Sequence, residues 1–212
     1  MRIFVMHYSK LVERKKHIIE QFSKQNITNY EFIENYDKDD IESESKFYSK
    51  DYKRSTMSLH LKHLYVYKLL AGGSEDALIF EDDVVLCENF METLNKYLTQ
   101  LPIDYDMLFL GNGCNLHIEK DKILPDKFIY EKCLYPTTWG GNGSSRCSDS
   151  YMISNACSKK MFGYVKKLNS PIKLPIDWWI NDAARHINLK MYWAEPTIVA
   201  QGSQTGLFSG SR

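Results

Sequence analysis

Three consecutive carboxylates, Glu81-Asp82-Asp83, are the residues of this sequence best suited to chemistry. They follow the apolar run 77–80 and precede Val84-Val85, which favours a buried strand that ends at the carboxylates. Open α/β sheets bind ligands at this end of their strands. Two unit charges about 4 Å apart repel by roughly 4 kcal/mol at an effective dielectric constant of about 20, so such a site favours a bound cation. Oxygen ligands select Mg²⁺ or Mn²⁺.

The alternative for the same triplet is an acidic turn, with each carboxylate solvated or capping the next helix. Acidic triplets are common, but apolar runs on both sides of one are not, and they favour the metal site. The sequence contains neither a GxGxxG nor a GxxxxGK[ST] pattern, so the common phosphate-binding loops are absent. A two-metal phosphodiesterase or nucleotidyltransferase would need further dispersed acidic or histidine ligands, and no second cluster is present in the sequence.

Alternating apolar and amphipathic segments are expected to position the triplet in one α/β domain spanning residues 1–212, with a mostly parallel central sheet and helices on both faces. Short apolar runs predict strands, and apolar residues at helical spacing predict helices. The predicted strands are 3–8, 30–33, 77–80, 107–110, 151–153 and 191–193, and the predicted helices are 10–25, 55–70, 88–101, 155–168 and one that begins at 177. Ser55 is expected to cap one of these helices, and Ser154 or Asn155 another. Residues 35–54 and 112–148 are expected to be loops that recognise an acceptor. The segment 35–54 is highly charged and lacks periodicity, so it is expected to be a mobile loop rather than a packed element.

The composition of the chain limits which kinds of partner the protein can have. Lys plus Arg and Asp plus Glu both number 27, so the formal net charge is zero, which argues against a nucleic-acid partner. The N-terminal run turns polar too early for a secretory leader, and no apolar run has the length of a membrane-spanning helix, so we expect a cytoplasmic protein.

The five cysteines form no CxxC pair, which favours reduced thiols. Cys114, His117, Cys133 and Cys147 lie close together in the sequence, and a zinc site or a single disulfide is the alternative. Their spacing matches no standard zinc pattern.

The segment Leu78-Ile79-Phe80-Glu81-Asp82-Asp83-Val84 resembles the metal motif of glycosyltransferase family 25, which contains bacterial lipooligosaccharide galactosyltransferases and procollagen galactosyltransferases. Further stretches follow in the order of that family: 5–16 with Arg14, Ser58-Leu59-His60-Leu61, Asp106-Met107-Leu108-Phe109-Leu110-Gly111, and Pro175-Ile176-Asp177-Trp178-Trp179 followed by Glu195-Pro196. The resemblance covers nearly the whole chain except residues 35–54 and 112–148.

The resemblance implies a single Rossmann-like type A glycosyltransferase (GT-A) domain. It would bind a UDP-sugar through Mn²⁺ (or Mg²⁺) and transfer a hexose, galactose or glucose, with inversion. The acceptor would be a glycan or a hydroxylysine-type group of a glycoprotein. A catalytically inactive module that only binds a nucleotide sugar or glycan is the alternative.

Single residues take roles from the same resemblance. Glu81 and Asp83 are expected to hold the metal, because side chains two residues apart share one side of an extended chain. Arg14, Glu81 and Asp82 are expected to contact the donor, with Asp82 reaching the ribose or the sugar. Asp177 matches a late aspartate of the family and is expected to be the catalytic base, with a helix N-cap as its structural alternative. If Asp177 is only a cap, the base would be sought at Asp149 or Asp182.

The sequence departs from the family after its first strand and near its C-terminal end. His7-Tyr8 replaces the usual Asn-Leu pair after the first strand. Ser203 stands where collagen-modifying relatives have a histidine that looks like a third metal ligand, so this contact is missing or comes from Gln201 or Gln204. Trp178 and Trp179 are adjacent on a helix and point apart, so only one of them can stack on an acceptor sugar.

Overall fold

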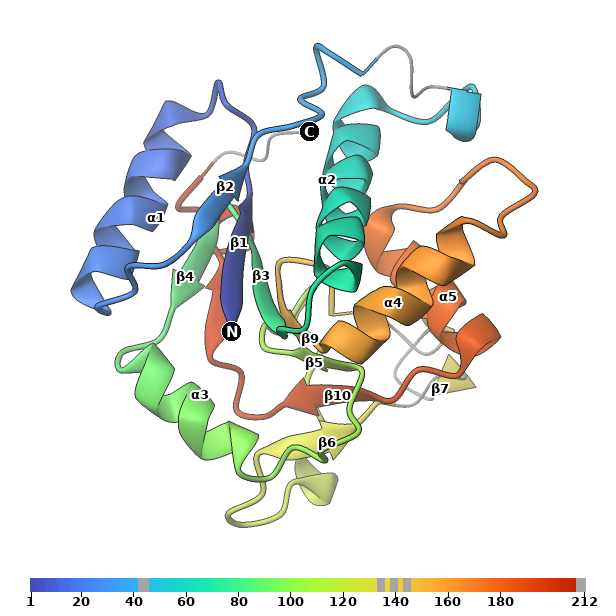
Figure 1. Ribbon diagram of the computed structural model, residues 1–212. Helices are drawn as coiled ribbons and strands as arrows, with labels where there is room; N and C mark the ends of the chain where they lie inside the picture. Colours follow the sequence, from blue (N-terminus) through green and yellow to red (C-terminus); the bar gives the residue numbers. More distant parts are fainter. Residues whose placement is uncertain (42–45, 133–135, 138–140, 143–145, 209–212) are drawn as a thin grey trace.

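The computed structural model describes residues 1–41, 46–132, 136–137, 141–142 and 146–208 (Figure 1). A seven-stranded sheet forms its centre, in the order β2-β1-β3-β9-β5-β10-β6. The strands are β1 (Arg2–Met6), β2 (Glu31–Ile33), β3 (Ala77–Glu81), β5 (Met107–Phe109), β6 (Ile129–Glu131), β9 (Ser150–Ile153) and β10 (Met191–Ala194).

Most strands of this sheet run in one direction. β1 is parallel to β2 and β3, and β10 is parallel to β5. β9 is antiparallel to both β3 and β5, and β6 is antiparallel to β10. The predicted α/β class with a mostly parallel sheet is therefore confirmed. Because β9 runs backwards between β3 and β5, its first residues lie at the edge where those two strands end.

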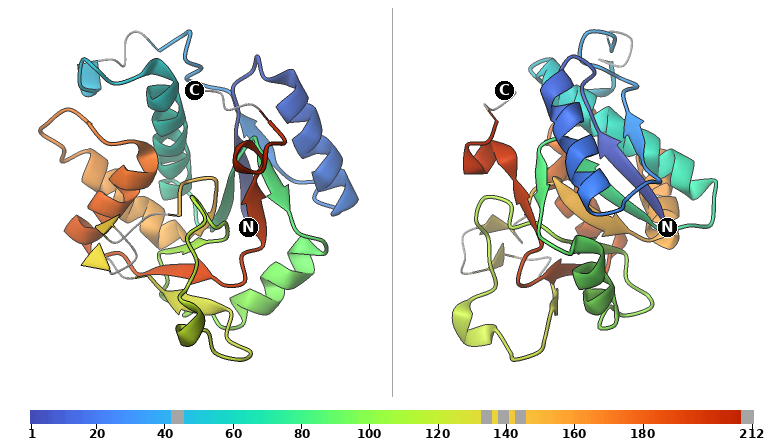
Figure 2. Two further views of the ribbon diagram at one scale, coloured as in Figure 1. Left: turned by 180° about the vertical axis from the view of Figure 1, so that it is seen from behind. Right: turned by 90° about the vertical axis from the view of Figure 1, so that its left-hand side faces the viewer.

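Helices cover both faces of the sheet, as the sequence predicts (Figures 1 and 2). α1 (Val12–Lys24) and α3 (Phe90–Leu98) pack on one face, and α2 (Arg54–Ala71), α4 (Asn155–Val165) and α5 (Ile176–Ile187) pack on the other. The alternation along β1 explains this arrangement, since Val5 joins the apolar cluster under α1 and α3 while Phe4 joins the cluster under α2, α4 and α5.

One of the two predicted helix caps is correct. The Ser154 hydroxyl accepts a hydrogen bond from the backbone N–H of Cys157 at 3.0 Å and caps α4. Ser55 is wrong as a cap, because α2 begins one residue earlier, after Lys53, and has no side-chain cap. No helix in the described part of the chain is both long and apolar enough to cross a bilayer.

Several short elements escape the sequence patterns. β4 (Val84–Leu86) pairs antiparallel with β11 (Val199–Gln201), and α6 (Gly202–Thr205) follows directly. The 3₁₀ turn η2 (Lys120–Lys122) and the small pair β7 (Pro136–Thr137) and β8 (Gly141–Asn142) lie within the predicted 112–148 loop.

The described part of the predicted 35–54 loop packs against the rest of the domain and is not a mobile loop. The Ser49 N–H donates to the carbonyl of Ile172 at 3.0 Å, and Ile41 and Tyr48 are buried.

Candidate active site

The acidic triplet forms the end of β3 and the turn into β4. Glu81 is the last residue of β3, and Asp82 and Asp83 make the turn. The predicted extended geometry from Glu81 to Asp83 is therefore wrong, because the apolar residues after the triplet belong to a second strand that leaves in another direction. Any convergence of the Glu81 and Asp83 carboxylates comes from this turn and not from strand alternation.

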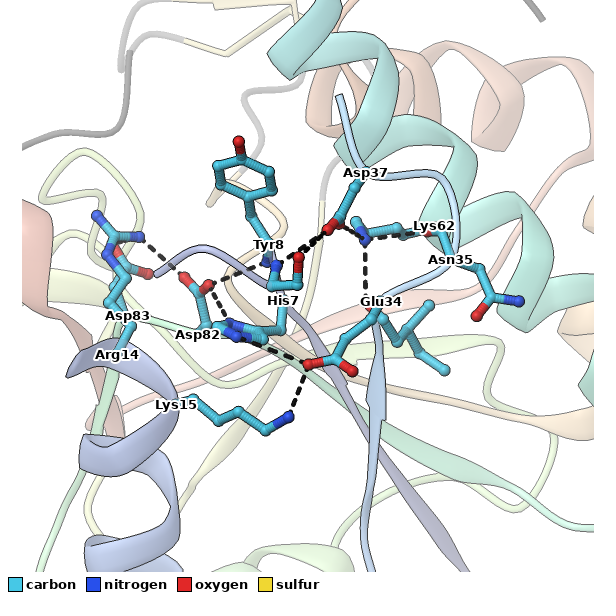
Figure 3. Close-up of polar contacts among 12 residues, drawn as sticks. His7, Tyr8, Arg14, Lys15, Glu34, Asn35, Asp37, Lys62, Asp82 and Asp83 are labelled. Atoms are coloured by element: carbon cyan, nitrogen blue, oxygen red, sulfur yellow. Dashed lines mark hydrogen bonds and ion pairs between the residues drawn. The ribbon is translucent and has the colours of Figure 1, made fainter. Parts of the chain in front are cut away.

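Asp82 is held by two basic side chains (Figure 3). Its Oδ2 lies 2.8 Å from Nδ1 of His7 and accepts the backbone N–H of Tyr8 at 3.4 Å, and its Oδ1 accepts Nη1 of Arg14 at 2.9 Å. The register of β1 and β3 brings His7 and Asp82 together, because Met6 pairs with Glu81 and these two residues come directly after them. All three side chains are buried. His7, a departure from the family pattern, is thus a polar partner that sequence reasoning did not assign.

Asp83 is 2% exposed and keeps one oxygen without a partner. Its Oδ2 accepts the backbone N–H of Ser203 at 3.3 Å and lies 3.7 Å from Nη1 of Arg14, while Oδ1 is buried and bonds to nothing in the described structure. The pairing of β4 with β11 brings the C-terminal segment here, and the N–H of Gly202 donates to the Asp83 carbonyl at 2.6 Å.

Ser203 therefore lies beside Asp83, at the position that the resemblance assigns to a metal-binding histidine, but it offers its backbone N–H. Gln201 and Gln204 are hydrogen-bonded to each other, Nε2 to Oε1 at 2.6 Å. Among the described residues, neither glutamine side chain forms a hydrogen bond with Asp83.

A fourth carboxylate, Asp149, lies next to Glu81. The N–H of Glu81 donates to the Asp149 carbonyl at 2.8 Å, and Oε1 of Glu81 accepts the Ser148 hydroxyl at 2.7 Å. Burial raises the pKa of Glu81 well above its usual range, and the negative charges of Asp83 and Asp149 raise it further. The reversed direction of β9 explains why Asp149, considered from the sequence only as a fallback base, arrives at this edge.

Asp149 is almost completely buried, and burial raises its pKa to about 7. Its Oδ2 accepts the Ser150 hydroxyl at 2.8 Å, and its Oδ1 has no partner in the described structure. Gly111 makes room for this carboxylate, because a Cβ atom there would lie 2.4 Å from Oδ2 of Asp149.

These carboxylates suit a divalent cation that receives few ligands from the protein. Unpartnered, buried oxygens on Asp83 and Asp149 and the raised pKa of Glu81 indicate negative charge without compensation. Within the described ranges, however, no three His, Cys, Asp or Glu side chains converge closely enough to enclose a metal. A cation here would complete its coordination with substrate oxygens and water, as Mg²⁺ and similar ions do at phosphate sites.

A cavity of about 340 Å³ opens beside the triplet. It lies between the C-terminal ends of β1 and β3 and the first turns of α1 and α2, and its volume falls in the range of small-molecule sites. Lys62, one of its lining residues, forms a buried ion pair in which its Nζ donates to Oδ1 of Asp37 at 2.7 Å. The lining residues are Met6, His7, Tyr8, Leu11, Arg14, Lys38, Ser55, Ser58, Leu59, Lys62, Glu81 and Asp82.

Asp177 lies away from that cavity, in the first turn of α5. Pro175 precedes the helix and no side chain caps it, so the N-cap alternative is wrong. Burial raises the pKa of Asp177. Its charge in turn raises the pKa of Tyr52 and, together with Asp149, that of Cys147, for both of which burial is the larger cause. Asp177 and Asp149 therefore both lie within electrostatic reach of Cys147.

The neighbouring tryptophans divide as predicted. Trp179 is buried, with its ring 4.9 Å from that of His60, whereas Trp178 is 42% exposed. Of these two side chains, only Trp178 is available to stack on a sugar. Asp182, the other fallback base, accepts Nη2 of Arg185 at 3.3 Å on the same helix.

Replacing Asp149 with asparagine is expected to stabilise the metal-free protein at high pH. The pKa of the Asp149 carboxyl is 3.8 in an unfolded chain and about 7 in the folded protein, so folding takes up a proton at pH values between these two. The stability that this group contributes is present below pH 3.8 and is lost as the pH rises through 7. Asp149→Asn should therefore melt above the wild type at about pH 8, and the difference should shrink toward about pH 5. Thermal unfolding in EDTA measures this, and an advantage that is constant with pH would contradict it.

Comparison with known proteins assigns the chain to a family. The model of glycosyltransferase family 25, described as an LPS biosynthesis protein, matches residues 1–180. A provisionally named glycosyltransferase of Haemophilus influenzae is 25% identical over 208 residues, which are 93% of this chain and 69% of the relative. One from Acanthamoeba polyphaga mimivirus is 24% identical over 141 residues, 62% of this chain and 42% of the relative. The match thus spans less than half of the viral protein.

Solved structures give distant likenesses. A glycosyltransferase involved in glycosylation of the major capsid of PBCV-1 has a TM-score of 0.44 and 10% identity, covering 100% of this chain and 95% of that chain. Mouse xyloside xylosyltransferase 1 has a TM-score of 0.39 and 10% identity, covering 89% of this chain and 63% of that chain. Scores this low support no functional assignment. The family match spans most of the sequence and both halves of the sheet, and this chain belongs to glycosyltransferase family 25.

Proposed function

We propose that this protein transfers a hexose, galactose or glucose, from a UDP-sugar to a hydroxyl group of a glycan or of a hydroxylysine-type residue in a glycoprotein. The reaction would need a divalent cation, Mn²⁺ or Mg²⁺, and would invert the anomeric centre. The observation that supports this most is Asp83, a buried carboxylate with one free oxygen, in the turn beside a 340 Å³ cavity where β1 and β3 end.

The cavity has the features that a nucleotide needs. Arg14 and Lys38 bring positive charge to its wall, and Tyr8 supplies an aromatic ring. Glu81 and Asp83 would hold the cation, which as a Lewis acid would stabilise the departing diphosphate. Asp82 already uses both oxygens on His7 and Arg14, so its role would be to hold Arg14 in place toward the donor.

The acceptor would approach from the side of α5. Asp177 would take the proton from the acceptor hydroxyl as this attacks the anomeric carbon. The raised pKa of its carboxyl makes it a better proton acceptor than an ordinary aspartate. The exposed ring of Trp178, next in the chain, would offer a stacking surface for the acceptor sugar.

Mn²⁺ with UDP is expected to raise the melting temperature by about 5–10 °C at roughly a hundredfold excess over the dissociation constant. UDP alone should raise it much less, because the carboxylates beside the cavity repel an uncompensated diphosphate. Differential scanning fluorimetry measures the shift, with Mn²⁺ plus inorganic phosphate as the control. Equal shifts by UDP with and without Mn²⁺ would place the nucleotide elsewhere.

The inactive binding module remains a second candidate for one reason: the described residues contain no three convergent metal-binding side chains. Release of UDP from a panel of UDP-sugars, with Mn²⁺ and with EDTA, separates the two functions. A transferase releases UDP with at least one donor in Mn²⁺ only. Tight UDP-sugar binding without any release, across donors and acceptors, would establish the binding module.

A further inference from the structure

Two cysteines of the predicted 112–148 loop meet beside the acceptor side of the site. Sγ of Cys114 lies 3.7 Å from Sγ of Cys147, and the two residues are 33 positions apart. Cys114 is exposed and Cys147 is half-buried. The remaining described cysteines, Cys87 and Cys157, make no such contact with another cysteine, and Cys133 lies outside the described residues.

The backbone holds the two cysteines together. A Cβ atom on Gly113 would lie 1.8 Å from the carbonyl oxygen of Arg146, so only glycine permits the two chain segments to approach this closely. Cys114 and Cys147, the next residues of each segment, have φ angles of 57° and 62°, in the left-handed region that cysteine seldom occupies. Arg146 is locked in turn, since its Nη2 donates to Oε2 of Glu195 at 2.6 Å.

We propose that Cys114 and Cys147 form a redox-modification site, which a small-molecule disulfide converts to a disulfide bond in the folded protein and which thereby slows sugar transfer. Formation of the bond is independent of the proposed function, whereas its effect on turnover rests on it.

The chemistry balances as two exchanges. The Cys114 thiolate attacks one sulfur of the oxidant, the oxidant's S–S bond breaks, and one thiol leaves with a proton from solvent. Cys147 then gives its proton to solvent and attacks the Cys114 sulfur, which expels the second thiol. Two protein thiols are oxidised and one disulfide is reduced to two thiols. Cys114 is the first nucleophile because it is exposed, whereas burial raises the pKa of Cys147.

Slower transfer follows from the neighbours of Cys147. A disulfide is about 2.05 Å long, so the sulfurs must approach each other from 3.7 Å. The next two residues both contact Glu81: the Ser148 hydroxyl donates to its side chain, and the Asp149 carbonyl accepts its backbone N–H. Because displacement of about 1 Å near reacting groups can cost roughly a hundredfold in rate, closure should lower transfer by on the order of tenfold or more.

Oxidised glutathione, applied to the native full chain and followed by alkylation and peptide mapping, tests the site. The wild type has five cysteines and should keep three free thiols, with a Cys114–Cys147 link in the map. Cys87→Ser, a matched control elsewhere on the surface, and Cys133→Ser should form the same link. Cys147→Ser should instead carry glutathione on Cys114. A link to Cys133, or no link in the native wild type, would overturn the site.

Turnover supplies the second readout. Oxidised wild type should transfer sugar on the order of tenfold more slowly than reduced wild type and recover with a thiol reductant, while Cys114→Ser should not respond to the oxidant. Linked protein that transfers at the reduced rate would overturn the regulatory half. A reduced protein that shows no transfer with any donor contradicts the proposed function, and the thiol count still decides the modification site.

Discussion

Replacing Asp83 with asparagine is expected to lower the rate of sugar transfer by about a thousandfold or more while the fold survives. Asparagine keeps the size of the side chain and can still accept the backbone N–H of Ser203. It removes the charge that a divalent cation needs, and Lewis-acid stabilisation of a leaving diphosphate is worth several kcal/mol. Initial rates of UDP release in saturating Mn²⁺ measure the loss, and calorimetric titration of Mn²⁺ with UDP shows whether metal binding has weakened.

Asp104→Asn is the matched control. Asp104 is an exposed aspartate paired with Lys190, outside the residues that line the cavity. Its replacement should leave the rate within about twofold of the wild type, as for most surface substitutions. A wild-type rate in Asp83→Asn, or a wild-type enzyme that EDTA does not slow, would show that the metal site is elsewhere or absent.

Much of the fold follows from local patterns. Each predicted strand of the central sheet forms within two residues of its expected place, because short apolar runs buried on both faces allow few alternatives. The helices are also found, although the helix predicted over 88–101 is the shorter α3, Phe90–Leu98. Helix ends depend on tertiary contacts as well as on local residues, as the missing Ser55 cap of α2 shows.

The geometry of the site is harder to predict from the sequence, because it depends on strand direction and on pairing between residues far apart in the chain. Nothing local in 150–153 tells whether β9 runs parallel or antiparallel, yet the antiparallel direction is what carries Asp149 to Glu81. The β4–β11 pair joins residues more than a hundred positions apart and converts the acidic run into a turn. The contact between Ser203 and Asp83 was implied by the family resemblance alone, since no periodicity marks it.

Substitution of Asp177 by asparagine is expected to preserve donor binding and to lower turnover by about a hundredfold to ten-thousandfold, the usual cost of losing a general base. Asparagine keeps the shape of the side chain in the first turn of α5, where no cap depends on the carboxylate. It cannot take up a proton. The dissociation constant for UDP with Mn²⁺ should stay at the wild-type value, because Asp177 does not line the nucleotide cavity. Steady-state kinetics with a donor and an acceptor give kcat, and calorimetry gives the donor affinity.

Asp182→Asn provides the control on the same helix, because Asp182 is also half-buried but pairs with Arg185 and not with the site. Asp182→Asn should therefore keep the wild-type turnover, whereas Asp177→Asn should lose transfer to the acceptor. Asp177→Asn should still hydrolyse the donor slowly in Mn²⁺, since the metal would still activate the leaving group. If Asp177→Asn transfers sugar at the wild-type rate, the base must be sought at Asp149, whose carboxyl with a pKa of about 7 would then be the better proton acceptor.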